Sequence, residues 1–419
     1  MLWLCVRLPL LARESLAANA EEAMERLAGW SYQWSSQVNY RLTGPPLLWL
    51  ELGASHSLFG GHTALLAKLE AGLKQLGYSH VCALAPSPHG AALLTYADQE
   101  RCVFTRAQLR TRLESLPLTL LDLPEAVRDA LHSAGLRRIG QVLALPAAAI
   151  ARRFGPATSL YLRQLLDEAG DPRPAWTLPA TYQTRCEFGC ELRDTTALLF
   201  PLQRLLLEFQ GYLRGRDCAV LRFTLKLEHY RHPSSNLTIG LSAPAREAAQ
   251  FLQLARERLH NIVLPAPVSG LGLEALEFTS PSIVQGDFFG SNAQQLQQLQ
   301  LLLDRLRARL GPDQVQGLQP WADYRPERAW RAAPPAQAII GPRTGDDYTP
   351  QRPCFLATDL QRIAPPAQLL SGPERIESGW WDRADAARDY YVARSEDGAR
   401  LWVFRDLADG AWYLQGLWT

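Results

Sequence analysis

The first third of the chain alternates short apolar runs with segments of helical spacing. Nearly continuous apolar runs are typical of buried strands, and apolar residues at intervals of three and four are typical of helices. The run at 64–76 ends at Gly77, a common helix stop. We expect a layered α/β domain over residues 1–115. Its candidate strands are 2–8, 47–52 and 81–85, and its candidate helices are 21–29, 64–76 and a segment near Ala91.

Residues 116–171 have a different pattern, in which short helical segments alternate with turns. Two of these segments are joined by Gly135-Leu-Arg-Arg-Ile-Gly140, which resembles a helix-hairpin-helix. Such a hairpin presents backbone N–H groups that can hold a phosphate without reading a base. An ordinary helical packing unit with solvated arginines explains the pattern equally well. The candidate DNA-binding residues are Gly135, Arg137, Arg138, Gly140, Arg152 and Arg153.

A proline-rich stretch at 172–179 predicts a boundary, and residues 180–282 then follow a β-α-β-β-α-β pattern. Residues 283–353 hold a leucine-striped helix at 294–310 and a segment rich in Pro, Gly, Arg and Gln, which we interpret as linker. Residues 354–419 are dense in Trp and Tyr and predict a small β module, in which the aromatic residues form either a core or a binding surface. The fold class is therefore a multidomain α+β chain.

Composition narrows the function classes. The formal charge is +1, so any contact with nucleic acid must come from local patches of positive charge. The seven cysteines are scattered, and Cys186 and Cys190, which would face the same side of a strand, lack the second pair expected of a zinc site. Buried free thiols in a reducing compartment explain them better. The apolar residues 1–12 are too few to span a bilayer, and we expect a cytoplasmic protein.

The order of these parts resembles the palm, thumb and little finger of Y-family DNA polymerases. Several segments are similar to the ImuB (inducible mutagenesis protein B) branch of that family, over nearly the whole chain. They are Leu58-Phe-Gly-Gly61, Leu84-Ala-Pro-Ser-Pro88, Leu199-Phe-Pro-Leu202, Gly215-Arg-Asp-Cys218, Arg388-Asp-Tyr-Tyr-Val-Ala-Arg394 and, with the highest specificity, Gly372-Pro-Glu-Arg-Ile-Glu-Ser-Gly-Trp-Trp381.

The resemblance implies that the polymerase chemistry is lost. Active Y-family members hold two Mg²⁺ ions with carboxylates. In this chain Val6 and Leu8 occupy the acidic places of the first strand, and Pro46 and Leu47 replace the second acidic pair. Glu51 remains at a trailing, non-catalytic position. We therefore expect no catalytic residues, no metal and no cofactor. The segment between Ala12 and the helix near Glu21 is also short, which predicts a palm without the fingers region.

Gln285-Gly-Asp-Phe-Phe289 resembles the pentapeptide with which bacterial proteins bind the β sliding clamp. In this mode a Gln forms hydrogen bonds while two bulky apolar groups fill a pocket. The candidate clamp-binding residues are Gln285, Asp287, Phe288 and Phe289, whereas Gly286 stands where Leu is usual. The alternative is a loop whose two Phe residues close the preceding core.

The resemblance implies a non-catalytic scaffold of bacterial SOS-induced translesion synthesis. Its expected partners are primer–template DNA, the β sliding clamp, an error-prone DnaE-type polymerase and the RecA-like ImuA, with no membrane. An active Y-family translesion polymerase is the main alternative. A remnant that misfolds because the fingers are lost is a third.

Overall fold

A computed structural model describes residues 1–281 except 16 and 54, residues 291–333, 335, 352–353 and 355–418 except 383; the side chains of 291–297, 312 and 358 are also outside the description. The chain divides into two compact units, Met1–Arg309 and Leu310–Thr419, which are described separately below. Both combine strands with helices or turns, and the α+β class predicted from the sequence is confirmed.

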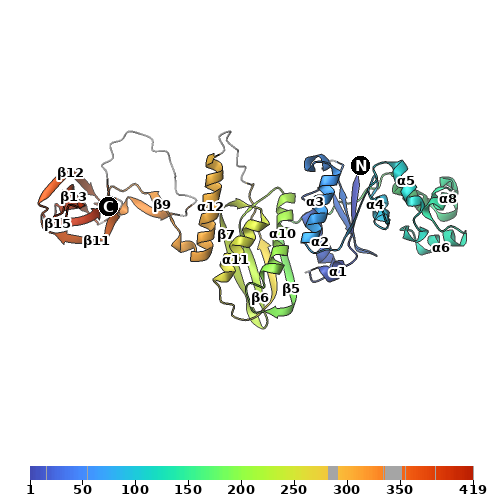
Figure 1. The fold of residues 1–419 in the computed structure, drawn as a ribbon, viewed down its shortest axis with the longest axis horizontal. Helices are drawn as coiled ribbons and strands as arrows, with labels where there is room; N and C mark the ends of the chain where they lie inside the picture. Colours follow the sequence, from blue (N-terminus) through green and yellow to red (C-terminus); the bar gives the residue numbers. More distant parts are fainter. Residues whose placement is uncertain are drawn as a thin grey trace. The chain divides into compact units, whose positions relative to one another are not determined.

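The first unit begins with a four-stranded antiparallel sheet in the order β2-β3-β1-β4. Side chains alternate across this sheet, so each strand contributes to two cores. Leu4 and Val6 pack with the helices α2 and α3 on one face, and Trp3 and Cys5 pack with α4 and α5 on the other (Figure 1). The strands are β1 (Trp3–Arg7), β2 (Val38–Arg41), β3 (Leu47–Glu51) and β4 (Val81–Ala85), and the helices are α2 (Ala20–Ser31), α3 (His62–Gln75), α4 (Pro88–Leu94) and α5 (Arg106–Glu114).

The connection from β1 to α2 is short, as the sequence predicted. It contains one four-residue helix, α1 (Leu11–Glu14). Asn19 then caps α2, because its side chain accepts a hydrogen bond from the backbone N–H of Glu22 at 2.8 Å.

Four short helices follow, and they share one core with the α4 face of the sheet. They are α6 (Glu125–Ser133), α7 (Ile139–Leu143), α8 (Ala147–Phe154) and α9 (Pro156–Leu165). Leu131, Ile139, Val142, Ile150 and Leu162 are buried in that core. The proline-rich stretch after α9 lies against the sheet edge, where Trp176 N–H donates to Val38 O at 2.8 Å.

The predicted β-α-β-β-α-β pattern after the proline-rich stretch is confirmed over residues 182–275. Four antiparallel strands in the order β5-β8-β6-β7 carry α10 and α11 on one face. Cys186 is buried and Cys190 is exposed, so the two thiols do not share an environment. The elements are β5 (Tyr182–Leu192), α10 (Leu199–Gly215), β6 (Val220–His229), β7 (His232–Ala245), α11 (Ala248–His260) and β8 (Val268–Ala275). The helix α12 (Ser291–Leu310) follows, and its Asp304 accepts a hydrogen bond from Ser242 N–H at 2.7 Å.

The linker prediction for residues 311–353 is wrong over residues 317–333. Here β9 (Gly317–Pro320) and β10 (Trp330–Ala333) pair antiparallel, and Arg325 between them is 2% exposed. The low apolar content misled the prediction, because this segment is held by hydrogen bonds and ion pairs rather than by a hydrophobic stripe.

The C-terminal β module is confirmed as a five-stranded antiparallel sheet in the order β11-β15-β14-β13-β12. Its aromatic residues form a core in which the rings of Tyr390 and Trp402 stack at 4.6 Å, with Phe404 and Ile376 beside them. Its strands are β11 (Phe355–Ile363), β12 (Gln368–Ser378), β13 (Ala386–Arg394), β14 (Arg400–Asp406) and β15 (Trp412–Leu417).

Candidate nucleic-acid interface

The sheet register shows which residues lie side by side at the positions where a polymerase would carry its metal-binding carboxylates. Leu47 of β3 pairs with Arg7 of β1, and Val6 pairs with Leu48. Val6 and Leu8 are fully buried on the α2–α3 face, so the side chain that stands beside Leu47 belongs to Arg7. Arg7, one position from both Val6 and Leu8, was not among the residues that the sequence singled out. Strand alternation was the signal that could have found it.

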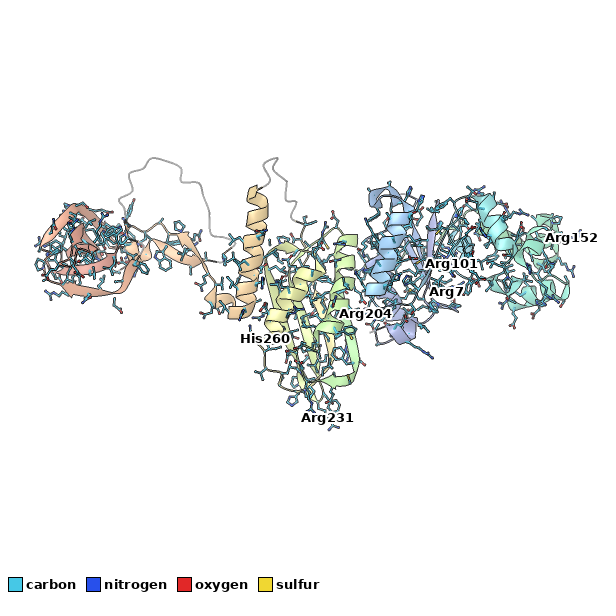
Figure 2. All side chains as sticks on the ribbon, viewed as in Figure 1. Arg7, Arg101, Arg152, Arg204, Arg231 and His260 are labelled. Carbon is cyan, nitrogen blue, oxygen red and sulfur yellow. The ribbon has the colours of Figure 1, made fainter. Side chains whose placement is uncertain are left out.

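Arg7, which is labelled in Figure 2, points to the face of the sheet opposite Val6 and Leu8, and two contacts fix it there. Its Nη2 donates a hydrogen bond to Thr95 O at 3.1 Å, and its guanidinium carbon lies 4.5 Å from the centre of the Tyr96 ring. Glu51 is four residues from Leu47 along β3, which is about 13 Å. Its carboxylate accepts a hydrogen bond from Gly53 N–H at 2.9 Å. The paired positions Arg7 and Leu47 thus offer a guanidinium and an alkyl group, neither of which coordinates Mg²⁺.

A cavity of about 510 Å³ opens beside this pair and is bordered by several basic and aromatic groups. Arg41 forms an ion pair with Asp122 there. Nearby, Arg173 pairs with Asp171 at 2.8 Å and lies 4.4 Å from the centre of a Trp49 ring. These two carboxylates are therefore engaged by arginines. The lining includes Arg41, Trp49, His89, Tyr96, Asp122, Arg128 and Tyr161.

His89 in this cavity stays neutral at pH 7. Burial and the neighbouring Arg173 guanidinium together lower the pKa of His89 to about 4, against the opposing effect of Asp171. The positive charge of the cavity therefore comes from arginine side chains, which do not lose their protons in the physiological range.

The predicted helix-hairpin-helix residues are placed around α6, α7 and α8. Gly135 has a φ of +84°, which suits the tight turn after α6. The backbone N–H groups of Arg137 and Arg138 both donate to the Gln141 side chain, at 2.7 and 3.0 Å. These donors are occupied, so a phosphate contact here must use the arginine side chains.

Two other residues that were predicted to contact DNA, Gly140 and Arg137, make contacts within the fold. An added Cβ on Gly140 would approach Glu114 Cα of α5 to 3.0 Å, so this glycine allows α7 to pack against α5. Arg137 Nη1 donates to His132 O at the end of α6. The side chains of Arg138, Arg152 and Arg153 are exposed. Arg152 projects from α8, one of the helices α6–α9, which we call the thumb-like helices (Figure 2).

The open face of the second sheet carries mixed charge. The register aligns Arg185, Gly272 and Lys226 in one row across three strands. Arg185 pairs with Glu228 at 2.8 Å, and Arg222 pairs with Glu277 at 2.7 Å. This face is polar, and it is flat at its glycines. The charges of Arg185 and Arg222 are already neutralised by their glutamate partners.

The clamp-binding residues Gln285, Asp287, Phe288 and Phe289 lie outside the described residues. The structure therefore leaves them as a sequence-based proposal.

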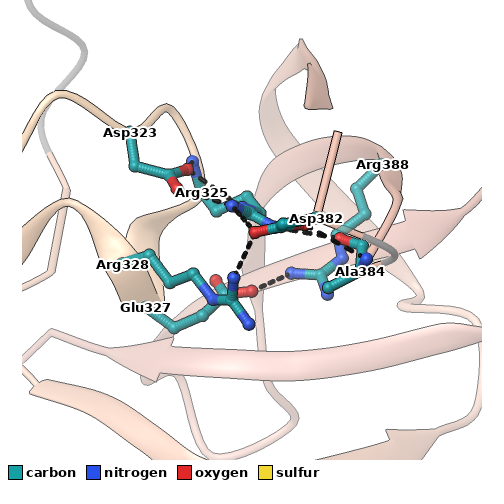
Figure 3. A network of polar contacts seen from close by, with 7 residues as sticks. All are labelled: Asp323, Arg325, Glu327, Arg328, Asp382, Ala384 and Arg388. Atoms are coloured by element: carbon teal, nitrogen blue, oxygen red, sulfur yellow. Dashed lines mark hydrogen bonds and ion pairs between the residues drawn. The ribbon is translucent and has the colours of Figure 1, made fainter. Parts of the chain in front are cut away.

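In the C-terminal unit, a network of ion pairs joins the β9–β10 connection to the loop between β12 and β13 (Figure 3). Arg325 donates to Asp323 at 2.6 Å and to Asp382 at 2.7 Å, and it also donates to Ala384 O at 3.0 Å. The hydrogen bonds from Arg325 lower the pKa of Asp382 to about 2. Arg388 adds a link to Glu327 at 2.9 Å.

Exposed aromatic side chains adjoin this network. Trp380 and Trp381 are 79% and 57% exposed, and Tyr324 next to Arg325 is 77% exposed. Arg325 lies 5.7 Å from the centre of a Trp381 ring, and the two tryptophans contact each other edge to face. We call Tyr324, Trp380 and Trp381 the aromatic patch. Large exposed aromatic groups on a rigid support are characteristic of protein-binding surfaces.

Comparison with solved structures gives Y-family DNA polymerases. Two are DinB-type enzymes of Sulfolobus solfataricus, described as DinB (TM-score 0.32, 10% identity) and as a DinB family error-prone DNA polymerase (0.34, 12% identity); each match covers 67% of this chain and 100% of the other. The third is a Y-family DNA polymerase chimera of Dbh and Dpo4 (0.31, 10% identity), with 65% and 98% covered. No family model matches the chain.

Curated relatives give the particular protein to which the chain is similar. It is 26% identical over 437 residues to Protein ImuB from two strains of Caulobacter vibrioides, NA1000 and ATCC 19089. Each alignment covers 94% of this chain and 93% of the relative. The predicted resemblance to ImuB is confirmed as a similarity that extends over nearly the whole chain. In the described part of the chain, no helix is long and apolar enough to cross a bilayer.

Proposed function

We propose that this protein is a non-catalytic scaffold of bacterial translesion synthesis, which bridges DNA, the β sliding clamp and an error-prone DnaE-type polymerase. The observation that carries the proposal is the pairing of Arg7 with Leu47, where the adjacent strands β1 and β3 of the first sheet end and begin. A two-metal mechanism needs carboxylates that bridge both ions. A fixed guanidinium at this place repels Mg²⁺ and favours an anion such as a phosphate.

DNA contact is assigned to the thumb-like helices rather than to the open sheet face. Arg138, Arg152 and Arg153 are exposed, and none of these three side chains forms an ion pair with another residue that the structure describes. The arginines Arg185 and Arg222 of the sheet face are paired with glutamates. Contacts to phosphates alone predict binding that is independent of sequence and sensitive to salt.

Replacing Arg152 and Arg153 with Gln should weaken binding to primer–template DNA for all sequences alike. Each lost phosphate contact lowers the slope of log affinity against log salt by about 1, so the double variant should lose about 2. Fluorescence anisotropy over a salt series measures both quantities. Arg256→Gln is the matched control, because Arg256 is exposed on α11, away from the thumb-like helices. An unchanged salt slope in the double variant would remove these helices from the interface.

The clamp and the polymerase are assigned to different segments of the chain. The pentapeptide at 285–289 fits a clamp pocket by its sequence, and the aromatic patch offers a recruiting surface for the polymerase or for the RecA-like ImuA. A scaffold requires such separate sites, because its partners must be held at the same time.

Binding to immobilised β clamp tests the tethering role. We expect the intact protein to bind and the Phe288→Ala/Phe289→Ala variant to lose at least about tenfold in affinity, because truncation of aromatic anchors removes most of the energy of such contacts. Phe200→Ala is the control, since Phe200 is 83% exposed on α10. Equal binding by the double variant and the control would assign Phe288 and Phe289 to a structural loop.

A further inference from the structure

Three side chains with metal-binding chemistry converge at the β4 edge of the first sheet. Glu70 comes from α3, Cys82 comes from β4, and His80 precedes that strand by one residue. One ligand atom of each lies within 4.8 Å of the others. Cys82 is 7% exposed, whereas Glu70 and His80 are partly exposed. A buried thiol with two more accessible oxygen and nitrogen donors forms a half-enclosed site.

The fold explains why these residues meet. Strand alternation points Cys82 and Leu84 toward α3, and α3 packs on the same core through Leu65, Leu69 and Leu73. Glu70 follows Leu69 on that helix. β4 is the edge strand of its sheet, and residues 101–103 hydrogen-bond along its outer edge at Leu84, two residues beyond Cys82.

One ring nitrogen of His80 has a backbone partner. His80 Nδ1 lies 2.9 Å from the Tyr78 carbonyl oxygen. Because a carbonyl oxygen only accepts, Nδ1 must carry the hydrogen, which leaves the lone pair on Nε2. Metal-bound histidines show this arrangement, in which one ring nitrogen donates to a backbone carbonyl and the other coordinates.

The other two donors are free for a ligand. Within the described part of the chain, no hydrogen bond or ion pair engages the Glu70 carboxylate or the Cys82 thiol. A structural salt bridge, the ordinary explanation for such a carboxylate, is therefore not seen for Glu70. The thiol is a softer donor than the carboxylate, and this difference determines which metal ion the site prefers.

We propose that Glu70, His80 and Cys82 bind one Zn²⁺ ion. Thiolate and imidazole are ligands that Zn²⁺ prefers, and carboxylate completes a set of three, with water at the fourth tetrahedral position. Mg²⁺ and Ca²⁺ prefer oxygen ligands throughout, so they are poor occupants. The thiol releases its proton to solvent as the metal binds. The ion ties α3 to the edge strand, on the face opposite Arg7, and has no connection with polymerase chemistry.

The test uses the full-length protein, freed of metal with a chelator and titrated with Co²⁺ as a spectroscopic probe for the zinc site. We expect one equivalent to give the thiolate-to-cobalt charge-transfer band and the visible bands of tetrahedral coordination, and one equivalent of Zn²⁺ to remove them. Zn²⁺ should also raise the Tm. Cys82→Ser should abolish the charge-transfer band, and His80→Gln should lower Zn²⁺ affinity at least about tenfold in competition with a chromophoric chelator.

Cys190→Ser is the matched control, because Cys190 is an exposed cysteine on β5 and should bind Co²⁺ and Zn²⁺ as the unaltered protein does. Circular dichroism of each metal-free variant establishes that it is folded. The proposal is overturned if the folded, unaltered protein gives no charge-transfer band, or if Cys82→Ser gives the same band as Cys190→Ser.

Discussion

Arg26→Met should destabilise the first unit by about 3–5 kcal/mol, the cost of leaving one buried charge without its partner. Arg26 of α2 donates to Glu208 of α10 through Nε at 2.7 Å, and the Glu208 side chain is 2% exposed. Arg204 lies 3.7 Å from the other Glu208 oxygen and compensates in part, which places the expected loss near the lower end. Urea unfolding of the full chain, followed by circular dichroism, measures the change.

The same pair should be replaceable by apolar residues. The double variant Arg26→Met/Glu208→Leu should recover most of the lost stability, because it removes both charges from the interface. Arg214→Met is the control: its partner Glu247 is exposed, and breaking that pair should cost less than about 1 kcal/mol. If Arg26→Met unfolds like Arg214→Met, α2 and α10 are not held together by this pair.

This interface also bears on the alternative of a misfolded remnant. Trp30 of α2 approaches α10 so closely that an added Cβ on Gly211 would lie 2.3 Å from its ring. Such close packing is specific to a folded state. A cooperative unfolding transition is therefore expected, despite the short connection between β1 and α2.

Arg325→Met should release the β9–β10 hairpin from the C-terminal sheet. The Arg325 guanidinium is the common partner of Asp323, Asp382 and the Ala384 carbonyl, and methionine can replace none of these hydrogen bonds. We expect hydrogen exchange of amides in 317–333 to accelerate at least about tenfold, since loss of one charged hydrogen bond suffices for that factor. Arg394→Met, which alters an exposed arginine of β13 outside the hairpin, is the control.

Low pH should weaken the same contact between Arg325 and Asp382. The pKa of Asp382 is about 2 in the folded protein, below the value near 4 of an unfolded chain. A depressed carboxyl pKa contributes stability that is present above about pH 4 and is lost as the pH falls toward 2. The protection factor of the hairpin amides, which is the intrinsic exchange rate at each pH divided by the observed rate, should fall over that window in the unaltered protein, whereas it should be low already at pH 7 in Arg325→Met. A variant as protected as the control at pH 7 would contradict the role given to Arg325.

The sequence predicted elements best where burial alone decides them. β4 lies at 81–85 as predicted, because four of its five residues are buried on both faces of the sheet. β2 was missed, since Val-Asn-Tyr-Arg has one buried residue and gives no alternating apolar pattern. The β9–β10 hairpin was missed because Arg325 and Asp382 are 57 residues apart, and such a pairing leaves no local signal.

In the candidate sites, too, the sequence showed which residue types are present but not which residues meet in space. The sequence predicted that Val6 and Leu8 stand in place of carboxylates, but which side chain lies beside Leu47 became known only from the strand register. The glycines of the hairpin were predicted as DNA contacts, whereas Gly140 serves helix packing. The convergence of Glu70, His80 and Cys82 was invisible, because Glu70 reaches the others only when α3 packs on the sheet.

Primer extension by the full-length protein with Mg²⁺ and all four nucleotides tests the central claim most directly. The central claim is that a guanidinium and an alkyl group have replaced the metal-binding carboxylates. An active Y-family polymerase serves as the positive control. The account predicts no Mg²⁺-dependent extension at protein concentrations that saturate the primer–template. Extension that requires Mg²⁺ and that disappears in a folded Arg7→Ala variant would contradict it.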